Sequence, residues 1–327
     1  MNLEIAVIGA GPAGIAAAVQ LKRFDLEHHV FEKNRIGGLL WNAHRVENYP
    51  AFPDGIPGAQ LAALFENHLE NFHIPVIPDA VISLDFHTGQ DRFLLSTAAG
   101  TFTANFVIVA SGTEPKTRGI LGLIPGELER YVVFEIFPLL GLTGKNIVIV
   151  GAGDIALDYA LHLSEFQGNN ITLVYRSEKI NALPLLVRRV RATPAVTMMS
   201  SAALKKVEKG DGYPLNLTFE SLAKIATKPL NKSFVGSRGG FSKEPLGAVA
   251  LDADILVGAI GRDPQTGFFT RRLHEMEKQL IDKGRLHMVG DVKNGRLRQA
   301  VIAAGSGVEA AMKIAAKVLA GHHEEAP

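Results

Sequence analysis

The chain has 327 residues, enough for two domains that each bury a hydrophobic core. Apolar residues make up 47% and charged residues 20%, and the net charge is +1, so nothing in the composition favours binding to nucleic acid or an anionic membrane. The sequence contains no cysteine, which excludes disulfides, thiolate metal sites, cysteine-ligated iron–sulfur clusters and thiol catalysis.

The apolar run from Leu3 to Val19 could be mistaken for a signal peptide. It lacks a basic first region, since the only charge near the start is Glu4. No stretch reaches the roughly 18 uncharged apolar residues that a membrane-spanning helix needs. We therefore expect a cytoplasmic protein without a membrane span, and the histidines show no metal-site spacing.

A first glycine-rich motif, GAGPAG, spans Gly9 to Gly14 and has the spacing of a dinucleotide-binding loop. The sequence predicts a strand at Ile5–Ile8, a helix at Ala13–Phe24 and a second strand at His28–Phe31 that ends at Glu32. In such a unit the glycines allow a tight turn, the approach of a pyrophosphate and close helix packing. The helix N-terminus attracts the phosphates, and Glu32 is placed to accept the ribose hydroxyls.

A second motif, GAGDIA, spans Gly151 to Ala156 in the same context. The sequence predicts a strand at Asn146–Val150, a helix at Asp154–Phe166 and a strand at Ile171–Tyr175. Arg176 then stands where an acidic residue would favour NAD. An arginine there can pair with a 2′-phosphate, so we expect NADPH; the alternative is a solvated cation at a strand end.

Three further segments read as buried strands, and a long alanine-rich helix follows the last one to about Ala320. The strands are Phe106–Ala110, Asp254–Ile260 and Leu286–Val289. Apolar strands that alternate with helices predict parallel sheets covered on both faces. Since sheet material returns after the second motif, we expect a nicotinamide domain inserted into a flavin domain.

The predicted domain limits follow from that insertion. The FAD-binding domain takes residues 1–115 and 246–327, and the NAD(P)H-binding domain takes 116–245. The connections are expected near 113–118 and 244–250, and Lys232–Gly247 reads as loop and hinge.

Several motifs occur in the order found in one flavoprotein family. They are GAGPAG with Glu32, GGLLWNAHRVENYP (37–50), ASG (110–112), IPGE (124–127), GAGDIALDYAL (151–161), AIGRDP (259–264) and GDVKNGRLRQAVIAAGSG (290–307). The chain thus resembles the low-molecular-weight thioredoxin reductase family of pyridine nucleotide–flavin oxidoreductases. The resemblance implies an α/β fold of two Rossmann-like three-layer (ββα) dinucleotide-binding domains, and a homodimer.

The resemblance also implies two sets of cofactor-binding residues. The residues expected to hold FAD are Gly9, Gly11, Pro12, Ala13, Gly14, Glu32, Lys33, Gly38, Leu39, Asn48, Val81, Ser111, Gly112, Gly290, Asp291, Arg298, Gln299 and Ala300. Those expected to hold the nicotinamide nucleotide are Gly151, Gly153, Asp154, Ile155 and Arg176. The helix that begins near Gln299 would point its positive end at the flavin and stabilise the negative charge of the reduced ring.

The family's nucleotide pattern is His-Arg-Arg with another arginine a few residues later. This chain keeps Arg176 alone, and Ser177 and Asn181 occupy the other places. Lys179, Arg188 and Arg189 are candidates to compensate. We therefore expect an NADPH preference that is weaker than usual, with NADH as an alternative donor.

The family's redox-active dithiol should fall in Val132–Leu140, where this chain has Phe134 and Phe137. Thioredoxin reduction by the family mechanism is therefore excluded. The two aromatic side chains read either as packing or as part of an electron path. The thiol-free relatives are the ferredoxin/flavodoxin–NADP reductases of thioredoxin-reductase type.

Those reductases usually carry a C-terminal extension that covers the flavin, whereas this chain stops soon after its last helix. His322 or His323 reads either as a minimal cover or as part of a disordered tail. Trp41 and Tyr49 lie in the flavin-facing segment and read either as stacking residues or as core packing.

We expect an FAD-dependent oxidoreductase that passes electrons from NADPH to a non-thiol acceptor, ferredoxin or flavodoxin, without a side-chain acid or base. The alternatives are a reductase of a small molecule such as a quinone, and a non-catalytic nucleotide-binding regulator or partner subunit. An acidic carrier would dock on basic residues. Candidates are Arg188, Arg189, Arg191, Arg271, Arg272, Arg296 and Arg298.

Overall fold

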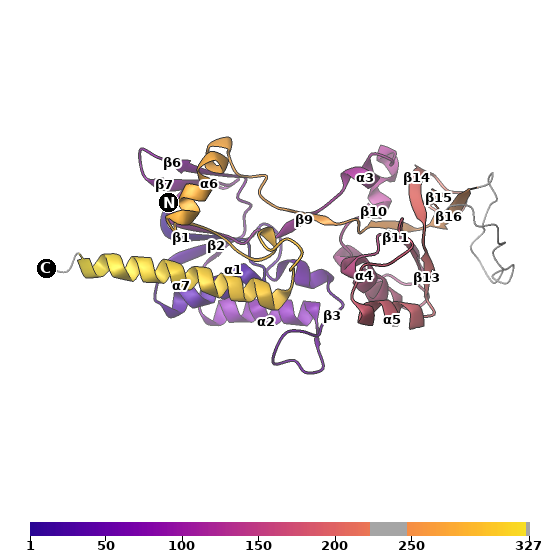
Figure 1. Cartoon of the computed structure of the whole chain (residues 1–327), viewed down its shortest axis with the longest axis horizontal. Helices are drawn as coiled ribbons and strands as arrows, with labels where there is room; N and C mark the ends of the chain where they lie inside the picture. The colour runs from indigo at the N-terminus through magenta and orange to yellow at the C-terminus, as the bar shows by residue number, and fades with distance from the viewer. Residues whose placement is uncertain (223–246, 325–327) are drawn as a thin grey trace. The chain divides into compact units, whose positions relative to one another are not determined.

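The computed structural model describes residues 1–222 and 247–324, with side chains described up to residue 320 (Figure 1). It divides into two compact units: Met1–Glu114 with Asp263–Pro327 form unit 1, and Pro115–Arg262 form unit 2. The predicted loop and hinge lies outside the described residues except for Gly247, and the side chains of His322 and His323 also lie outside them. Each unit is described by itself.

A seven-stranded sheet forms the centre of unit 1, in the order β5-β2-β1-β8-β7-β6, with β19 paired to β8. The strands are β1 (Asn2–Ile8), β2 (His28–Phe31), β5 (Val76–Ile77), β6 (Ser83–His87), β7 (Arg92–Ser96), β8 (Thr101–Val109) and β19 (Leu286–Met288). β1 pairs in parallel with β2 and β8. β6, β7 and β8 pair antiparallel, so this sheet is mixed, whereas the alternation of strands and helices predicts parallel pairing.

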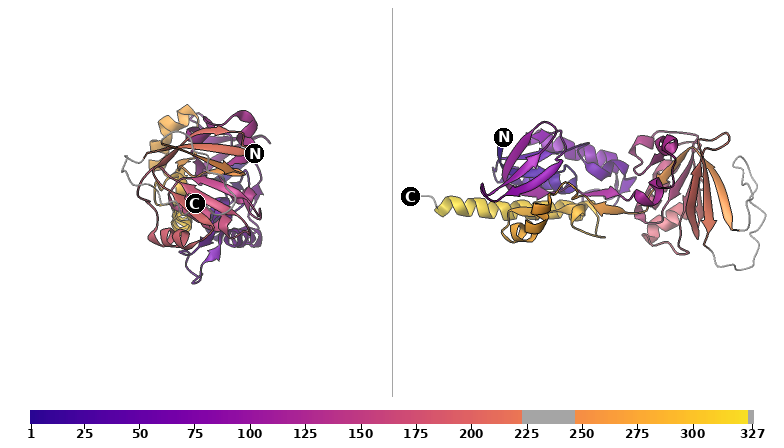
Figure 2. Two further views of the ribbon diagram at one scale, coloured as in Figure 1. Left: turned by 90° about the vertical axis from the view of Figure 1, so that its right-hand side faces the viewer. Right: turned by 90° about the horizontal axis from the view of Figure 1, so that it is seen from above.

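Alternating side chains of β1 face two different layers. Ile5 and Val7 pack with α1 (Pro12–Arg23) and α7 (Ala300–Glu324). Ala6 and Ile8 pack with β6, β7 and α6 (Arg271–Asp282). In Figure 1, α1 and α7 lie below β1 and β2, and α6 lies above them with β6 and β7; the right view of Figure 2 shows the same elements from above. Unit 1 therefore has the three-layer arrangement that the resemblance predicts.

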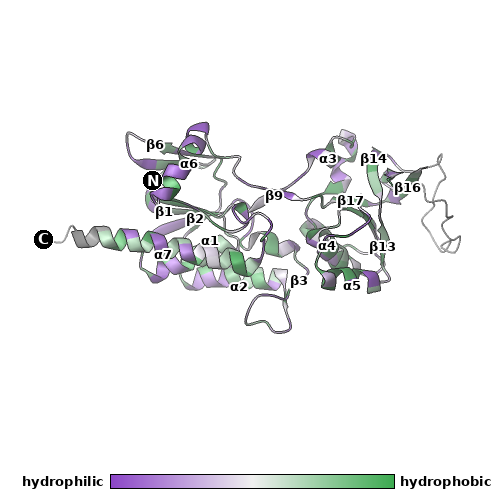
Figure 3. Cartoon of the chain, in the orientation of Figure 1, coloured by the Kyte–Doolittle hydropathy of each residue, from purple (hydrophilic) through white to green (hydrophobic). Residues whose placement is uncertain are grey.

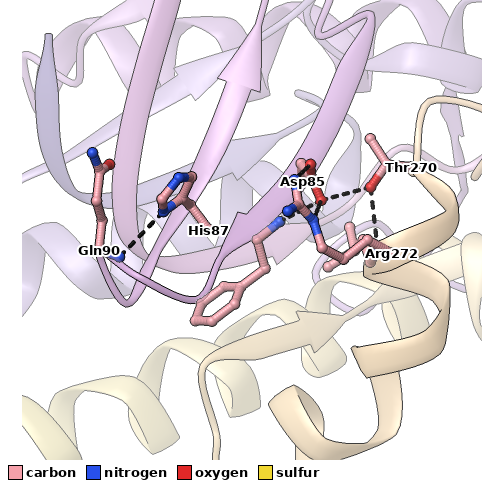
Figure 4. Close-up of polar contacts among 7 residues, drawn as sticks. Asp85, His87, Gln90, Thr270 and Arg272 are labelled. Atoms are coloured by element: carbon pink, nitrogen blue, oxygen red, sulfur yellow. Dashed lines mark hydrogen bonds and ion pairs between the residues drawn. The ribbon is translucent and has the colours of Figure 1, made fainter.

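A charged contact fastens α6 to the antiparallel strands (Figure 4). Thr270 caps the helix by accepting a hydrogen bond from Leu273 N at 3.2 Å, and its hydroxyl donates to Asp85 Oδ1 at 2.7 Å. Arg272 Nε donates to the same carboxylate at 3.0 Å, and its Nη2 also contacts Asp85. Much of α6 is hydrophilic (purple in Figure 3), while Leu273 and Leu280 are buried in the core.

Unit 2 contains a parallel five-stranded sheet in the order β10-β17-β11-β12-β13. Its strands are β10 (Val132–Val133), β11 (Asn146–Val150), β12 (Asn170–Val174), β13 (Val196–Met199) and β17 (Ile255–Gly258). One face packs on α4 (Asp154–Ser164) and α5 (Pro184–Ala192). The other packs on an antiparallel sheet of β14 (Ala202–Glu208), β15 (Leu215–Ser221) and β16 (Ala248–Ala253).

The domain limits differ from the predicted ones at the second connection. The sequence predicts that the inserted domain ends at residue 245, whereas unit 2 continues to Arg262. The reason is strand pairing, because β16 pairs with β15 and β17 lies between β10 and β11. The two connecting segments pair as β9 (Thr113–Pro115) and β18 (Arg262–Pro264).

Candidate functional site: two dinucleotide-binding loops

The first glycine loop is closed around the backbone of neighbouring strands. Gly9 has φ +104° and donates from its N–H to Phe31 O at 2.8 Å. A Cβ added to Gly9 would lie 2.4 Å from Ala110 O, and one added to Gly14 would lie 1.8 Å from Gly9 O. Only glycine fits either position, because a backbone atom cannot move aside as a flexible side chain can.

Gly11 is different, because a Cβ at this position would have no atom within 4 Å. Gly11 is the N-cap of α1, and Pro12 begins the helix. The open space therefore lies where free amide groups and the positive end of a helix meet. An anionic pyrophosphate fits such a place, and a side chain at Gly11 would occupy it.

The acidic residue predicted to bind ribose lies beside this loop. Glu32 accepts hydrogen bonds from Ala10 N and Asn34 N, both at 2.8 Å. Lys33, the next residue, is exposed. A Cβ on Gly38 would be 3.4 Å from Gly11 Cα, so the 3-10 helix η1 (Gly38–Asn42), which includes Leu39, approaches the same loop.

Residues from the end of the chain join the same edge of unit 1. A Cβ on Gly290 would lie 2.8 Å from Ala13 Cβ, and Asp291 follows in the 3-10 helix η4 (Gly290–Val292). Asn48 Nδ2 donates to Gln299 Oε1 at 2.6 Å. Arg298 precedes that glutamine, and Ala300 packs beside Leu40 and Tyr49.

Ser111 and Gly112 are held to the second connection by Gln265, which the sequence did not single out. Ser111 Oγ donates to Gln265 O at 2.6 Å, and Gln265 N donates to Gly112 O at 3.1 Å. When the side-chain amide of Gln265 is flipped, so that its oxygen and nitrogen exchange places, the oxygen accepts a hydrogen bond from Lys33 Nζ at 2.5 Å. No local sequence signal reveals this contact, because it joins segments far apart in the chain.

Val81, another predicted FAD residue, is buried in a core cluster that includes Phe31. Trp41 donates from Nε1 to Ile36 O at 2.8 Å and has Arg35 over its ring at 5.6 Å. Tyr49 stacks edge-on with Phe65, and burial raises the pKa of its hydroxyl. Both aromatics pack in one cluster with Leu40, which favours packing roles within unit 1.

The second glycine loop repeats the first within unit 2. Gly151 has φ +149°, donates to Val174 O at 2.9 Å, and would place a Cβ 2.2 Å from Ala259 O. Gly153 has no atom within 4 Å of an added Cβ and is the N-cap of α4. The same open space at a helix N-terminus thus occurs again, and it fits a second pyrophosphate.

The residues around this second loop differ in charge from those around the first. Asp154 accepts from Leu183 N at 2.7 Å and so ties the loop after β12 to the start of α4. Ile155 is 38% exposed, a surface that a bound nucleotide could cover. Arg176 is exposed and follows β12, whereas the corresponding strand of unit 1 leads to Glu32. A basic residue therefore follows this strand, where an acidic residue follows the corresponding strand of unit 1.

The segment that should carry a dithiol is packed against the sheet of unit 2. The ring of Phe134 approaches Gly258 so closely that an added Cβ would lie 2.4 Å from Cε1. This contact favours the packing interpretation of Phe134. Phe137 is half-buried and begins the 3-10 helix η3 (Phe137–Leu139).

The candidate docking residues are not equivalent. Arg188 and Arg191 on α5 and Arg296 are exposed, whereas Arg189 and Arg298 are half-buried. Arg271 pairs with Glu275 at 3.0 Å, and Arg272 pairs with Asp85, so these two charges already have acidic partners. No helix in the described part of the chain combines the length and apolarity needed to span a bilayer.

A family model described as pyridine nucleotide-disulphide oxidoreductase matches residues 3–307. The chain belongs to this family. Relatives include a thioredoxin reductase of Streptomyces clavuligerus, 30% identical over 94% of this chain and 92% of the relative. Another, from Neurospora crassa, is 28% identical over 100% of this chain and 96% of the relative.

Solved structures show the same fold. The thioredoxin reductase of Lactococcus lactis in its FR conformation matches with a TM-score of 0.76 at 21% identity, over 96% of this chain and 98% of that one. That of T. acidophilum has the same TM-score at 22% identity, over 97% and 99%. The predicted fold class and family are therefore confirmed, and the chain is an oxidoreductase of a family that uses FAD and a nicotinamide nucleotide.

Proposed function

We propose that this oxidoreductase takes electrons from NADPH onto FAD and delivers them to ferredoxin or flavodoxin. The observation that carries the proposal is the absence of cysteine from a chain whose two dinucleotide loops are intact. Thiol–disulfide exchange needs a thiolate on the enzyme, so a disulfide substrate cannot be reduced by the exchange that a redox-active dithiol performs. The electrons must leave from the flavin itself.

The residues divide between the two cofactors. In unit 1, the loop Gly9–Gly14 and Glu32 would hold the FAD pyrophosphate and ribose, and Asn48 with Gln299 would border the cofactor. In unit 2, Gly151, Gly153 and Arg176 would hold the nicotinamide nucleotide. The cofactors supply the hydride chemistry, while the protein binds and orients them. NADPH is the expected donor because Arg176 can pair with a 2′-phosphate.

Anaerobic reduction of the FAD-loaded protein tests the proposal. NADPH should bleach the flavin absorbance, and the reduced protein should then reduce ferredoxin or flavodoxin in a steady-state assay. Bleaching followed by turnover with a quinone alone would make the protein a small-molecule reductase. Absence of bleaching with both NADPH and NADH would favour a non-catalytic nucleotide-binding role and overturn the proposal.

A further inference from the structure

The strand order of unit 2 indicates where the two halves of a nucleotide would lie. The chain passes from β11 to β12 on one side, and later returns to β17 on the other side of β11. The sheet therefore reverses its order between β11 and β17, and ligands of such sheets lie outside the carboxyl ends of the strands at this point. Because Arg176 follows β12, the 2′-phosphate belongs on that side, and the nicotinamide belongs on the side of β17 and β10.

An ion pair lies on the nicotinamide side. Glu135 follows the end of β10, and Arg262 follows the turn after β17. Arg262 Nη2 lies 2.8 Å from Glu135 Oε1. The arginine side chain is 5% exposed, whereas the glutamate is 40% exposed, so the pair presents its acidic member toward solvent.

The charges of the pair also influence a buried residue of α4, the helix that follows the second glycine loop. Tyr159 of α4 is buried, and burial raises the pKa of its hydroxyl, with smaller opposing influences from Arg262 and Glu135. Both charges therefore act close to α4, and Glu135 itself belongs to Val132–Leu140, the segment in which the family's dithiol would fall. Dissolved salt screens the electrostatic effect of a half-buried ion pair less than that of an ion pair on an open surface.

We propose that Glu135 and Arg262 set the relative affinity of the protein for oxidised and reduced nicotinamide. The oxidised ring carries a positive charge and the reduced ring carries none, so an unbalanced charge nearby would favour one form. The paired charges largely cancel, which would let NADPH bind and NADP⁺ leave without strong bias. This inference rests on the proposed use of NADPH and assigns a positioning role to two residues that the glycine motifs do not include.

The test compares binding of NADP⁺ and tetrahydro-NADP, a redox-inert analogue with an uncharged ring, to the FAD-loaded protein by calorimetry. Glu135→Gln should shift the ratio of the two dissociation constants toward the uncharged ring by about threefold or more. Arg262→Gln should shift it toward NADP⁺ by a similar factor, and the double variant should return near the wild-type ratio. Glu220→Gln, which removes the acid of an exposed ion pair with Lys205 in the same unit, is the matched control.

The outcomes separate the inference from the function on which it rests. If neither nucleotide binds the wild-type protein, the proposed function fails. If both bind but the two single variants move both dissociation constants together, the pair is merely structural and the inference fails. Thermal unfolding of each variant accompanies the titrations, and a double variant that regains stability while its ratio stays shifted would also contradict the charge account.

Discussion

Asn48 Nδ2 donates a hydrogen bond of 2.6 Å to Gln299 Oε1, joining two segments that are 251 residues apart. Both residues are expected to border FAD, so the contact would join the N-terminal and C-terminal parts of unit 1 at the proposed cofactor site. We predict that Asn48→Ala raises the dissociation constant of FAD by about five- to tenfold, from loss of roughly 1 kcal/mol. The flavin fluorescence recorded as the protein is diluted and FAD dissociates measures this dissociation constant. Asn216→Ala, which breaks a contact with Asp252 in unit 2, should leave FAD binding unchanged.

The glycines of each loop should separate folding from cofactor binding. Gly11→Val adds a side chain where no atom lies within 4 Å, so the apoprotein should keep its thermal stability and lose FAD. Gly14→Val meets Gly9 O and should prevent normal folding. In unit 2, Gly153→Val should abolish NADPH binding while FAD is retained. Circular dichroism and flavin content distinguish these cases, and retention of FAD by Gly11→Val would contradict the assignment.

Acid stability should depend on Asp85. Its hydrogen bond with Arg272 is the main reason that its pKa is lowered from 3.8 to about 2. A carboxylate with a lowered folded-state pKa stabilises the protein above pH 3.8, and this contribution disappears as the pH falls toward 2. We expect Asp85→Asn to cost about 1 kcal/mol at pH 7, after allowance for the exposure of Arg272, and to lose less stability between pH 4 and 2 than the wild type. Urea unfolding at a series of pH values measures both the cost at pH 7 and the loss of stability at low pH. Parallel curves of unfolding free energy against pH for the variant and the wild type would contradict the prediction.

Histidine burial should reduce stability in mildly acidic solution. His28 is 3% exposed, and burial lowers its pKa below 6.5; His287 shifts in the same direction for the same reason. For a base with a lowered folded-state pKa, the unfolded chain binds protons more tightly, so stability falls as the pH drops below about 6.5. His28→Leu should flatten this dependence between pH 7 and 5.5. The same slope in His28→Leu, in wild type and in the exposed control His68→Leu would refute the prediction.

Arg176 should govern the choice of nucleotide. Arg176→Ala is expected to weaken NADPH binding by about tenfold or more, because a charge-assisted hydrogen bond to phosphate is lost. NADH binding should change less than about twofold. Lys209→Ala, which removes an exposed positive charge after β14, is the matched control for the loss of one charge in unit 2. Equal loss of both nucleotides in Arg176→Ala would reject the 2′-phosphate role, and unchanged binding of both would leave the arginine as a solvated cation at the strand end.

The parts predicted correctly are those whose geometry is local. The conformation of a glycine loop between a buried strand and a helix is determined by residues that are close in sequence. The strand predicted at Asn146–Val150 matches β11 at both ends. The antiparallel strands β6–β7 and β14–β16 were missed. For β6 and β7 a local signal was present, since Ser83–His87 alternates polar and apolar residues and His87 pairs with the nearby Arg92. α6 was missed although Thr270 at its N-cap and apolar residues on one face gave a usable signal. The contacts of Gln265 with Ser111 and Lys33 exist only after folding.

The most direct test of the account is a single-turnover measurement of flavin reoxidation. The protein is reduced by NADPH without oxygen and mixed rapidly with flavodoxin, ferredoxin or oxidised thioredoxin while flavin absorbance is followed. Flavodoxin or ferredoxin should reoxidise the flavin promptly, and thioredoxin should not reoxidise it. Reoxidation by thioredoxin, with both carrier proteins inert, would contradict it.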